Sequence, residues 1–152
     1  VVVDAAFVDS RLVTLAQLPG PKRLALLAGL GDCRRKVAAD ALAAALGEST
    51  DGKEAKRLVE ALGSIGSSWA WQTPGAGEKS EELAVRETAA RALVAAFVRY
   101  EDGVRQAASN ALMVVDWKAT PAFVAEARQG AGEKLAADLD ALAARFERNP
   151  AR

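Results

Sequence analysis

Apolar residues recur at three- and four-residue intervals along most of the chain, which is the spacing of one face of an α-helix. The pattern is clearest in an octad, R-x-x-A-[AS]-x-A-L, which occurs at residues 35–42, 86–93 and 105–112. At about 3.6 residues per turn, its alanines and leucine fall on one side of a helix. This mixture of small and large residues predicts helices that pack closely against one another.

The apolar face of each octad helix extends past the octad itself. Its members are Ala38, Ala41, Leu42, Ala45 and Leu46 in the first helix, Ala89, Ala92, Leu93, Ala96 and Phe97 in the second, and Ala108, Ala111, Leu112 and Val115 in the third. Such a face has to be covered by helices on both sides. We therefore expect the octad helices to stack in series as the second helices of successive pairs, lining one concave surface.

A second string precedes two of these helices. It reads L-x-x-L-x-x-[LI]-G at residues 24–31, and residues 59–66 repeat it with Val59 in the first position. A glycine after an apolar helical run is typical of a helix end. Asp32 and Asp102 stand three residues before the arginines of the first and third octads, and we expect each Asp to cap a helix N-terminus.

An apolar helix ended by glycine, a tight turn with Asp and then the octad helix resembles the HEAT repeat, in particular the short bacterial form related to phycobilisome lyases. The resemblance is strongest over residues 22–115 and weaker at both ends, as is usual for terminal capping repeats. It implies an all-α, armadillo-type fold: a right-handed α-solenoid of about eight antiparallel helices, in three to four HEAT-like pairs. We expect residues 1–152 to form this single domain. HEAT-like proteins commonly act as scaffolds or adaptors, so the resemblance also implies protein binding.

The pattern predicts helices along the whole chain, separated by short polar or glycine-rich links. Asp51 and Glu54 form a capping-box-like start for one of them, and Thr120 and Pro121 form a cap-then-proline start for another. The expected helices cover residues 4–18, 22–30, 33–46, 53–65, 80 or 81 to 99, 103–115, 121–129 and 133–147.

The repeat rhythm breaks at about residues 67–80, where we expect an inserted loop. This segment contains Trp69 and Trp71 in a chain with only 5% aromatic residues. One interpretation makes the tryptophans an apolar anchor for a partner, because Trp is enriched among binding hot spots. The other has them continue the preceding helix or fill a gap beside alanine-rich neighbours. One Trp in each role would reconcile the two.

Charge narrows the range of partners. The 20 basic and 20 acidic residues balance to zero, so no overall field attracts a polyanion, and nucleic-acid binding is disfavoured. The alternative is a stripe of Arg35, Arg86, Arg91 and Arg105 that binds a nucleic-acid backbone. Caps, ion pairs and solvated helix faces are the structural explanation of the same arginines.

The residue types limit the chemistry. With one cysteine and no histidine, the chain offers no internal disulfide and no His-dependent metal or nucleophile site. We predict no enzyme activity and no catalytic, cofactor or metal-binding residue. A lyase-type HEAT-like enzyme is an alternative for which no residue of this chain is matched. Cys33 is expected to be a small buried thiol.

The side of each octad helix opposite the apolar face is polar and mixed in sign. Together with Trp69 and Trp71, it supplies the predicted contacts for a protein or peptide partner: Lys36, Asp40, Glu87, Arg91, Gln106 and Asn110. Paired charges and hydrogen bonds would hold such a partner.

No run of 18 apolar residues is present, so we expect no membrane span and a cytoplasmic location. The chain opens on Val1 instead of Met. We therefore expect it to belong to a longer chain, which leaves room for further repeats and for an export signal that would place it in the periplasm.

Overall fold

The structure is a computed structural model, and it describes residues 20–72 and 79–148. Regular structure in these ranges is entirely helical, so this part of the protein is all-α. The helix expected at residues 4–18 lies outside the described residues. In chain order the elements are α2 (Gly20–Gly29), the 3-10 turn η1 (Leu30–Asp32), α3 (Lys36–Glu48), α4 (Gly52–Ile65), α5 (Ser68–Gln72), α6 (Lys79–Arg99), α7 (Asp102–Val115), α8 (Thr120–Gln129) and α9 (Glu133–Glu147).

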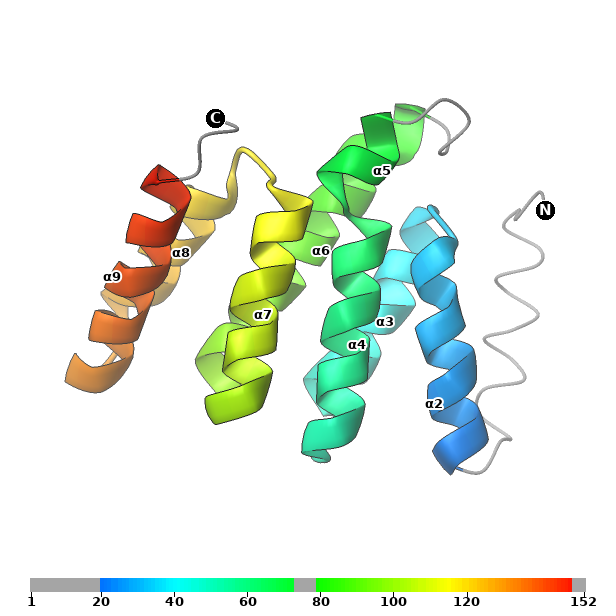
Figure 1. Ribbon diagram of the computed structural model, residues 1–152, viewed down its shortest axis with the longest axis horizontal. Helices are drawn as coiled ribbons and strands as arrows, with labels where there is room; N and C mark the ends of the chain where they lie inside the picture. Colours follow the sequence, from blue (N-terminus) through cyan, green and yellow to red (C-terminus); the bar gives the residue numbers. More distant parts are fainter. Residues whose placement is uncertain (1–19, 73–78, 149–152) are drawn as a thin grey trace.

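The helices lie in two layers (Figure 1). A front layer of α2, α4, α7 and α9 faces the viewer, and a back layer of α3, α6 and α8 lies behind it. Apart from the short α5, successive helices alternate between the layers. Within the back layer α6 packs against α3 and α8, and within the front layer α4 packs against α2 and α7.

The third octad lies in a different layer from the other two. The first two octads are in α3 and α6 of the back layer, whereas the third is in α7 of the front layer. The expectation that all three line one surface is therefore wrong. The reason is the two-residue link at Tyr100 and Glu101, which makes α7 the antiparallel neighbour of α6, while α4 intervenes between the first two octads.

The apolar faces predicted for the octad helices form the core. Leu42, Leu93 and Leu112 are completely buried, and most of the alanines beside them are buried as well. Ala41 and Ala92 are partly buried and pack against the same core. The helical period was thus sufficient to identify the packed side of each helix.

Helix starts follow the predictions only in part. Asp51 caps α4, with Oδ1 accepting from the backbone N–H of Lys53 at 2.8 Å and of Glu54 at 3.4 Å. The expected caps at Asp32 and Asp102 are wrong. Asp32 belongs to η1, so α3 begins at Lys36 instead of residue 33. Asp102 is itself the first residue of α7, with a left-handed φ of 50°.

The two predicted helix-ending glycines have a packing role. Gly66 follows α4 with φ −96°, which does not require glycine. A Cβ at this position, however, would lie 3.0 Å from both Ala89 Cβ and Val115 Cγ2. Similarly, a Cβ at Gly31 would lie 3.1 Å from the backbone of Ala61. Both glycines therefore allow a neighbouring helix to approach closely.

Three arginines close the C-terminal ends of helices. Arg86 donates from Nε to Gly66 O at 3.3 Å and from Nη2 to Val115 O at 2.8 Å, after α4 and at the end of α7 respectively. Arg99 donates to the carbonyls of Leu46, Gly47 and Ser49 at the end of α3. Arg105 donates from Nε to Phe97 O in the last turn of α6, at 2.7 Å. These side chains satisfy carbonyls that a helix leaves without partners.

The expected loop at 67–80 is wrong where the structure describes it. Residues Ser68–Gln72 form the short helix α5, and α6 begins at Lys79. Residues 73–78 lie outside the described part.

Candidate binding surface

The six predicted polar contact residues form three pairs, each within one helix. Lys36 Nζ and Asp40 Oδ2 are 2.6 Å apart on α3, Arg91 and Glu87 form a 4.0 Å ion pair on α6, and Gln106 Nε2 donates to Asn110 Oδ1 at 3.3 Å on α7. The first two pairs lie in the back layer and the third in the front layer, so the structure does not bring the six together on one surface. Their role in partner binding stays a prediction.

Two open clefts flank α7. The α7–α9 cleft has a volume of about 450 Å³ and the α4–α7 cleft about 530 Å³, and Gln106 lines both. The predicted pair Gln106 and Asn110 therefore lies on the ridge between two hollows.

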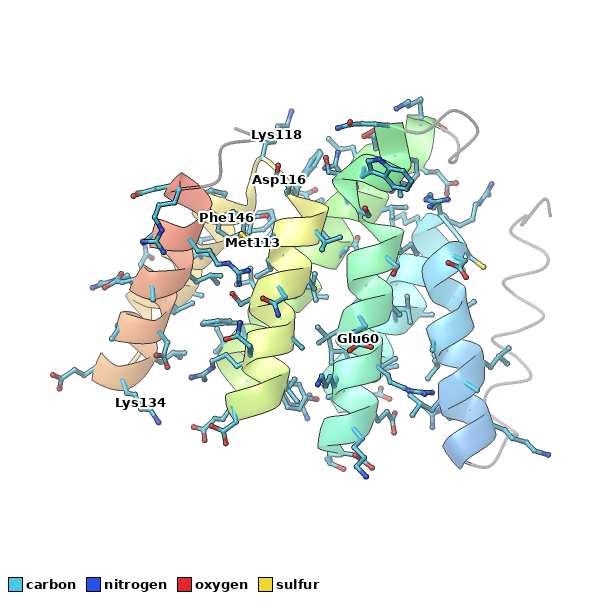
Figure 2. All side chains as sticks on the ribbon, in the orientation of Figure 1. Glu60, Met113, Asp116, Lys118, Lys134 and Phe146 are labelled. Atoms are coloured by element: carbon cyan, nitrogen blue, oxygen red, sulfur yellow. The ribbon has the colours of Figure 1, made fainter. Side chains whose placement is uncertain are left out.

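The α4–α7 cleft has an apolar floor and a polar rim. At its base a Cβ on Gly63 would lie 3.1 Å from Ala111 Cβ, so α4 and α7 nearly touch there. Val114 contributes an aliphatic side chain that is 51% exposed. Lys56 and Glu60 stand on the α4 side, and Figure 2 shows Glu60 on the face of α4 turned to the viewer.

Polar side chains cross the α7–α9 cleft. Arg105 Nη1 donates to Asp138 Oδ2 at 2.7 Å, and Arg145 Nη1 donates to Ser109 Oγ at 2.8 Å and Asn110 Oδ1 at 2.9 Å. Residue numbers rise together on the two helices, so α7 and α9 run parallel. Lys134 extends from the lower end of α9 (Figure 2). Polar bridges thus span the opening and leave space between them.

The two tryptophans of α5 have different roles. Trp71 is 1% exposed, and its Nε1 donates to Ile65 O at 2.8 Å. Trp69 is 77% exposed. Trp71 therefore connects α5 to the end of α4, whereas Trp69 presents an aromatic surface to solvent. The role of Trp69 as an anchor for a partner stays a prediction.

The four arginines of the alternative nucleic-acid stripe all have partners within the protein. Arg35 pairs with Glu81 at 3.0 Å, and Arg91 lies 4.0 Å from carboxylate oxygens of Glu87 and Glu126. Arg86 and Arg105 donate to backbone carbonyls, and their side chains are only 11% and 15% exposed. This arrangement favours the structural explanation of these arginines.

The pKa shifts of two carboxyl groups arise from side chains in direct contact with them. Burial by itself would raise the pKa of Glu82, but hydrogen bonds from Lys79 and Arg86 outweigh burial and hold that pKa below the usual 4.5. On the surface, the hydrogen bonds from Arg128 lower the pKa of Asp140. Cys33 is buried, as expected. Among residues 20–72 and 79–148, no three His, Cys, Asp or Glu side chains gather as a metal-binding group.

Sequence reasoning missed the contribution of α9. The sequence pattern assigned no role to Arg145 or Asp138, yet both hydrogen-bond to α7. Their separation of seven residues, about two helical turns, places them on one side of α9 and was the available signal.

Comparison of the chain with models of protein families, with curated proteins and with solved structures finds no match. The structure itself shows the class: in the part described, this is an all-α protein. Within that part, no helix combines the length and the apolar character needed to cross a membrane.

Proposed function

We propose that the protein is a non-catalytic module that binds a protein or peptide. We also propose that its two layers form a right-handed α-solenoid of HEAT-like pairs. Alternation of helices between the layers supports the second proposal, as do the apolar faces shared between neighbours in series. The close approaches at Gly31, after α2, and at Gly66, after α4, fit the same repeated unit.

The observation that carries the binding proposal is the pair of clefts beside α7. They are of the size of ligand-binding clefts, and each combines apolar floor atoms with polar groups on the rim. Because they share Gln106, one extended segment that crosses α7 can contact both. Polar side chains already in place on the ridge, Gln106 and Asn110, offer amide groups to a peptide backbone.

A larger partner has further points of contact. Trp69 supplies an exposed aromatic ring, and the polar pairs on α3 and α6 supply mixed charges on the back layer. The engaged arginines favour a protein partner over a nucleic acid, since a polyanion would have to compete with the ion pairs and carbonyls that they already bind.

Selection of peptides on the protein tests this proposal. Random 12-residue peptides are displayed and selected on the full chain, and the affinities of the commonest ones are measured for two variants, Val114→Arg and Ala141→Arg. Each variant places a long cation at an exposed cleft position. We expect at least one of them to weaken binding about tenfold or more, because the arginine fills the cleft.

Leu83→Arg is the matched control. Leu83 is an exposed apolar residue on α6, 58% exposed, and belongs to neither cleft. We expect this variant to bind the selected peptides as the native protein does. The proposal is wrong if no peptide is enriched, or if both cleft variants bind as tightly as the control.

A further inference from the structure

The α7–α9 cleft has an acidic end and a basic end. Glu101 and Asp102 line it at the start of α7, whereas Arg145 and Arg148 line it at the end of α9. Because α7 and α9 run parallel, these groups lie at opposite ends of the cleft. Lys134 at the lower end moderates the acidic charge there without cancelling it.

Arg145 differs from Arg105, the other arginine that crosses the cleft. Arg105 forms an ion pair with Asp138 at 2.7 Å. Arg145 instead donates from Nη1 to two neutral oxygens, of Ser109 and Asn110. Among residues 20–72 and 79–148 no carboxylate forms an ion pair with Arg145 or Arg148. A guanidinium carries five N–H donors in a planar fork that suits a carboxylate, so neutral partners fix Arg145 in place and leave donors for an anion.

The cleft also has an apolar contribution between its charged ends. Phe97 and Leu142 are buried beneath it, and Ala141 adds a small exposed side chain. A peptide side chain of moderate size can rest there, beside the Arg105–Asp138 pair, whose charges offset each other. This middle part does not suit a continuous run of charge of one sign.

We propose that the α7–α9 cleft binds a peptide segment with an acidic side chain on Arg145 and Arg148 and a basic side chain beside Glu101 and Asp102. This proposal rests on the proposed function and adds the chemistry of the ligand. Seven residues of α7 separate Asp102 from Ser109, or about 10 Å at the rise of an α-helix. An extended peptide covers this distance in about three residues, so the acid and the base stand about three positions apart.

A nucleic acid is the disfavoured occupant of this cleft. Its phosphates would meet Glu101 and Asp102 at one end and only two arginines, Arg145 and Arg148, at the other. A polyanion needs a continuous basic track, whereas a segment with one charge of each sign matches the cleft at both ends.

The test uses two labelled pools of 12-residue peptides and the full chain. In the first pool every peptide has Lys and Glu three residues apart among otherwise random positions; in the second, Gln replaces that Glu. We expect the native protein to retain the first pool at least about fivefold better than the second. Arg145→Gln should remove this preference, and Arg145→Lys should restore part of it, because lysine keeps the charge and loses the fork.

Two further variants protect the test from a folding artefact. Arg148→Gln removes an exposed arginine that, unlike Arg145, forms no hydrogen bond to α7. This variant should also reduce the preference for the first pool. Arg128→Gln is the matched control, because Arg128 pairs with Asp140 on the surface and lines neither cleft. Its preference between the pools should equal that of the native protein. Circular dichroism of each variant verifies that helicity is retained.

The outcomes separate this proposal from the proposed function. Equal retention of both pools, with binding still lost in Ala141→Arg, overturns the acidic ligand and leaves peptide binding intact. Absence of binding to either pool and to every displayed peptide overturns both. Tighter retention of a 12-nucleotide single strand than of the first pool overturns the peptide as occupant and favours a polyanion.

Discussion

Two of the helix–helix seams in the front layer, α4 with α7 and α7 with α9, are built differently. At the first seam Gly63 lies against Ala111, close enough that a Cβ on Gly63 would be 3.1 Å from the alanine methyl group. At the second, Arg105, Asp138 and Arg145 bridge the helices. A glycine and an alanine bring two helices into contact, whereas long polar side chains keep them apart and leave an opening.

At each seam an arginine joins the two helices by hydrogen bonds. The burial of that arginine decides how much it contributes to stability. Arg86 joins the ends of α4 and α7 by binding Gly66 O and Val115 O, with the ring of Trp117 5.0 Å from its guanidinium carbon. Arg145 joins α7 to α9 through a hydroxyl and an amide in an open cleft. The first arginine is largely buried, whereas the second lies in the cleft where we propose that a ligand binds.

The largest expected effect on the free energy of unfolding is that of removing the Arg86 side chain. Arg86→Ala leaves two carbonyls without their charged donor and Glu82 with Lys79 alone, and we expect the free energy of unfolding to fall by about 3 kcal/mol. Arg145→Ala should lower it by less than about 1 kcal/mol, because solvent can replace its contacts in the open cleft. Urea unfolding of both variants measures the difference. Equal losses would mean that the two seams do not differ in the way described.

Enlarging a side chain in each seam gives an effect of intermediate size. Gly63→Leu forces atoms into the contact with Ala111, and we expect it to lower the free energy of unfolding by about 1–3 kcal/mol. Ala141→Leu adds the same side chain at an exposed position in the α7–α9 cleft and should change stability by less than about 0.5 kcal/mol. Thermal unfolding followed by circular dichroism compares the two. A Gly63→Leu protein as stable as the native one would show that the tight seam can widen freely.

The smallest effect concerns the carboxylate that supports Arg86. Glu82 has a pKa below 4.5 in the folded protein, so its ionised form stabilises the fold above the ordinary pKa. This contribution disappears as the pH falls below about 4.5 and through the lowered pKa. Glu82→Gln should therefore lose a small part of the stability at pH 7, under about 1 kcal/mol, and lose less than the native protein on acidification. Urea unfolding at pH 7 and pH 3 tests the sign; an equal loss in both proteins would contradict it.

The sequence predicted the packed faces well because they depend on local periodicity. Leu42, Leu93 and Leu112 are buried as the octads indicated, and α9 has the predicted bounds, Glu133–Glu147. The layer of the third octad was not predictable in this way. Motif identity suggested that α7 repeats the position of α6, but the short link between them makes α7 its opposite neighbour.

The clefts and the arginine contacts could not be predicted from local sequence patterns, because they depend on residues far apart in the chain. Arg86 meets its carbonyl partners 20 and 29 residues away, so its role depends on the completed packing. The predicted Gln106 and Asn110 do border the clefts, whereas Arg145 was overlooked because a charge on the outer side of a helix usually faces only water.

The closure of α3 has a consequence for how the chain forms during synthesis. The carbonyls of Leu46 and Ser49 accept hydrogen bonds from Arg99 and from the hydroxyl of Tyr100, which lie 50 to 54 positions later in the chain. While the ribosome has released only α2 to α4, the last turn of α3 has no such donors and is free to fray. Emergence of Tyr100 therefore completes an element translated much earlier, which makes the first half of the nascent chain dependent on the second.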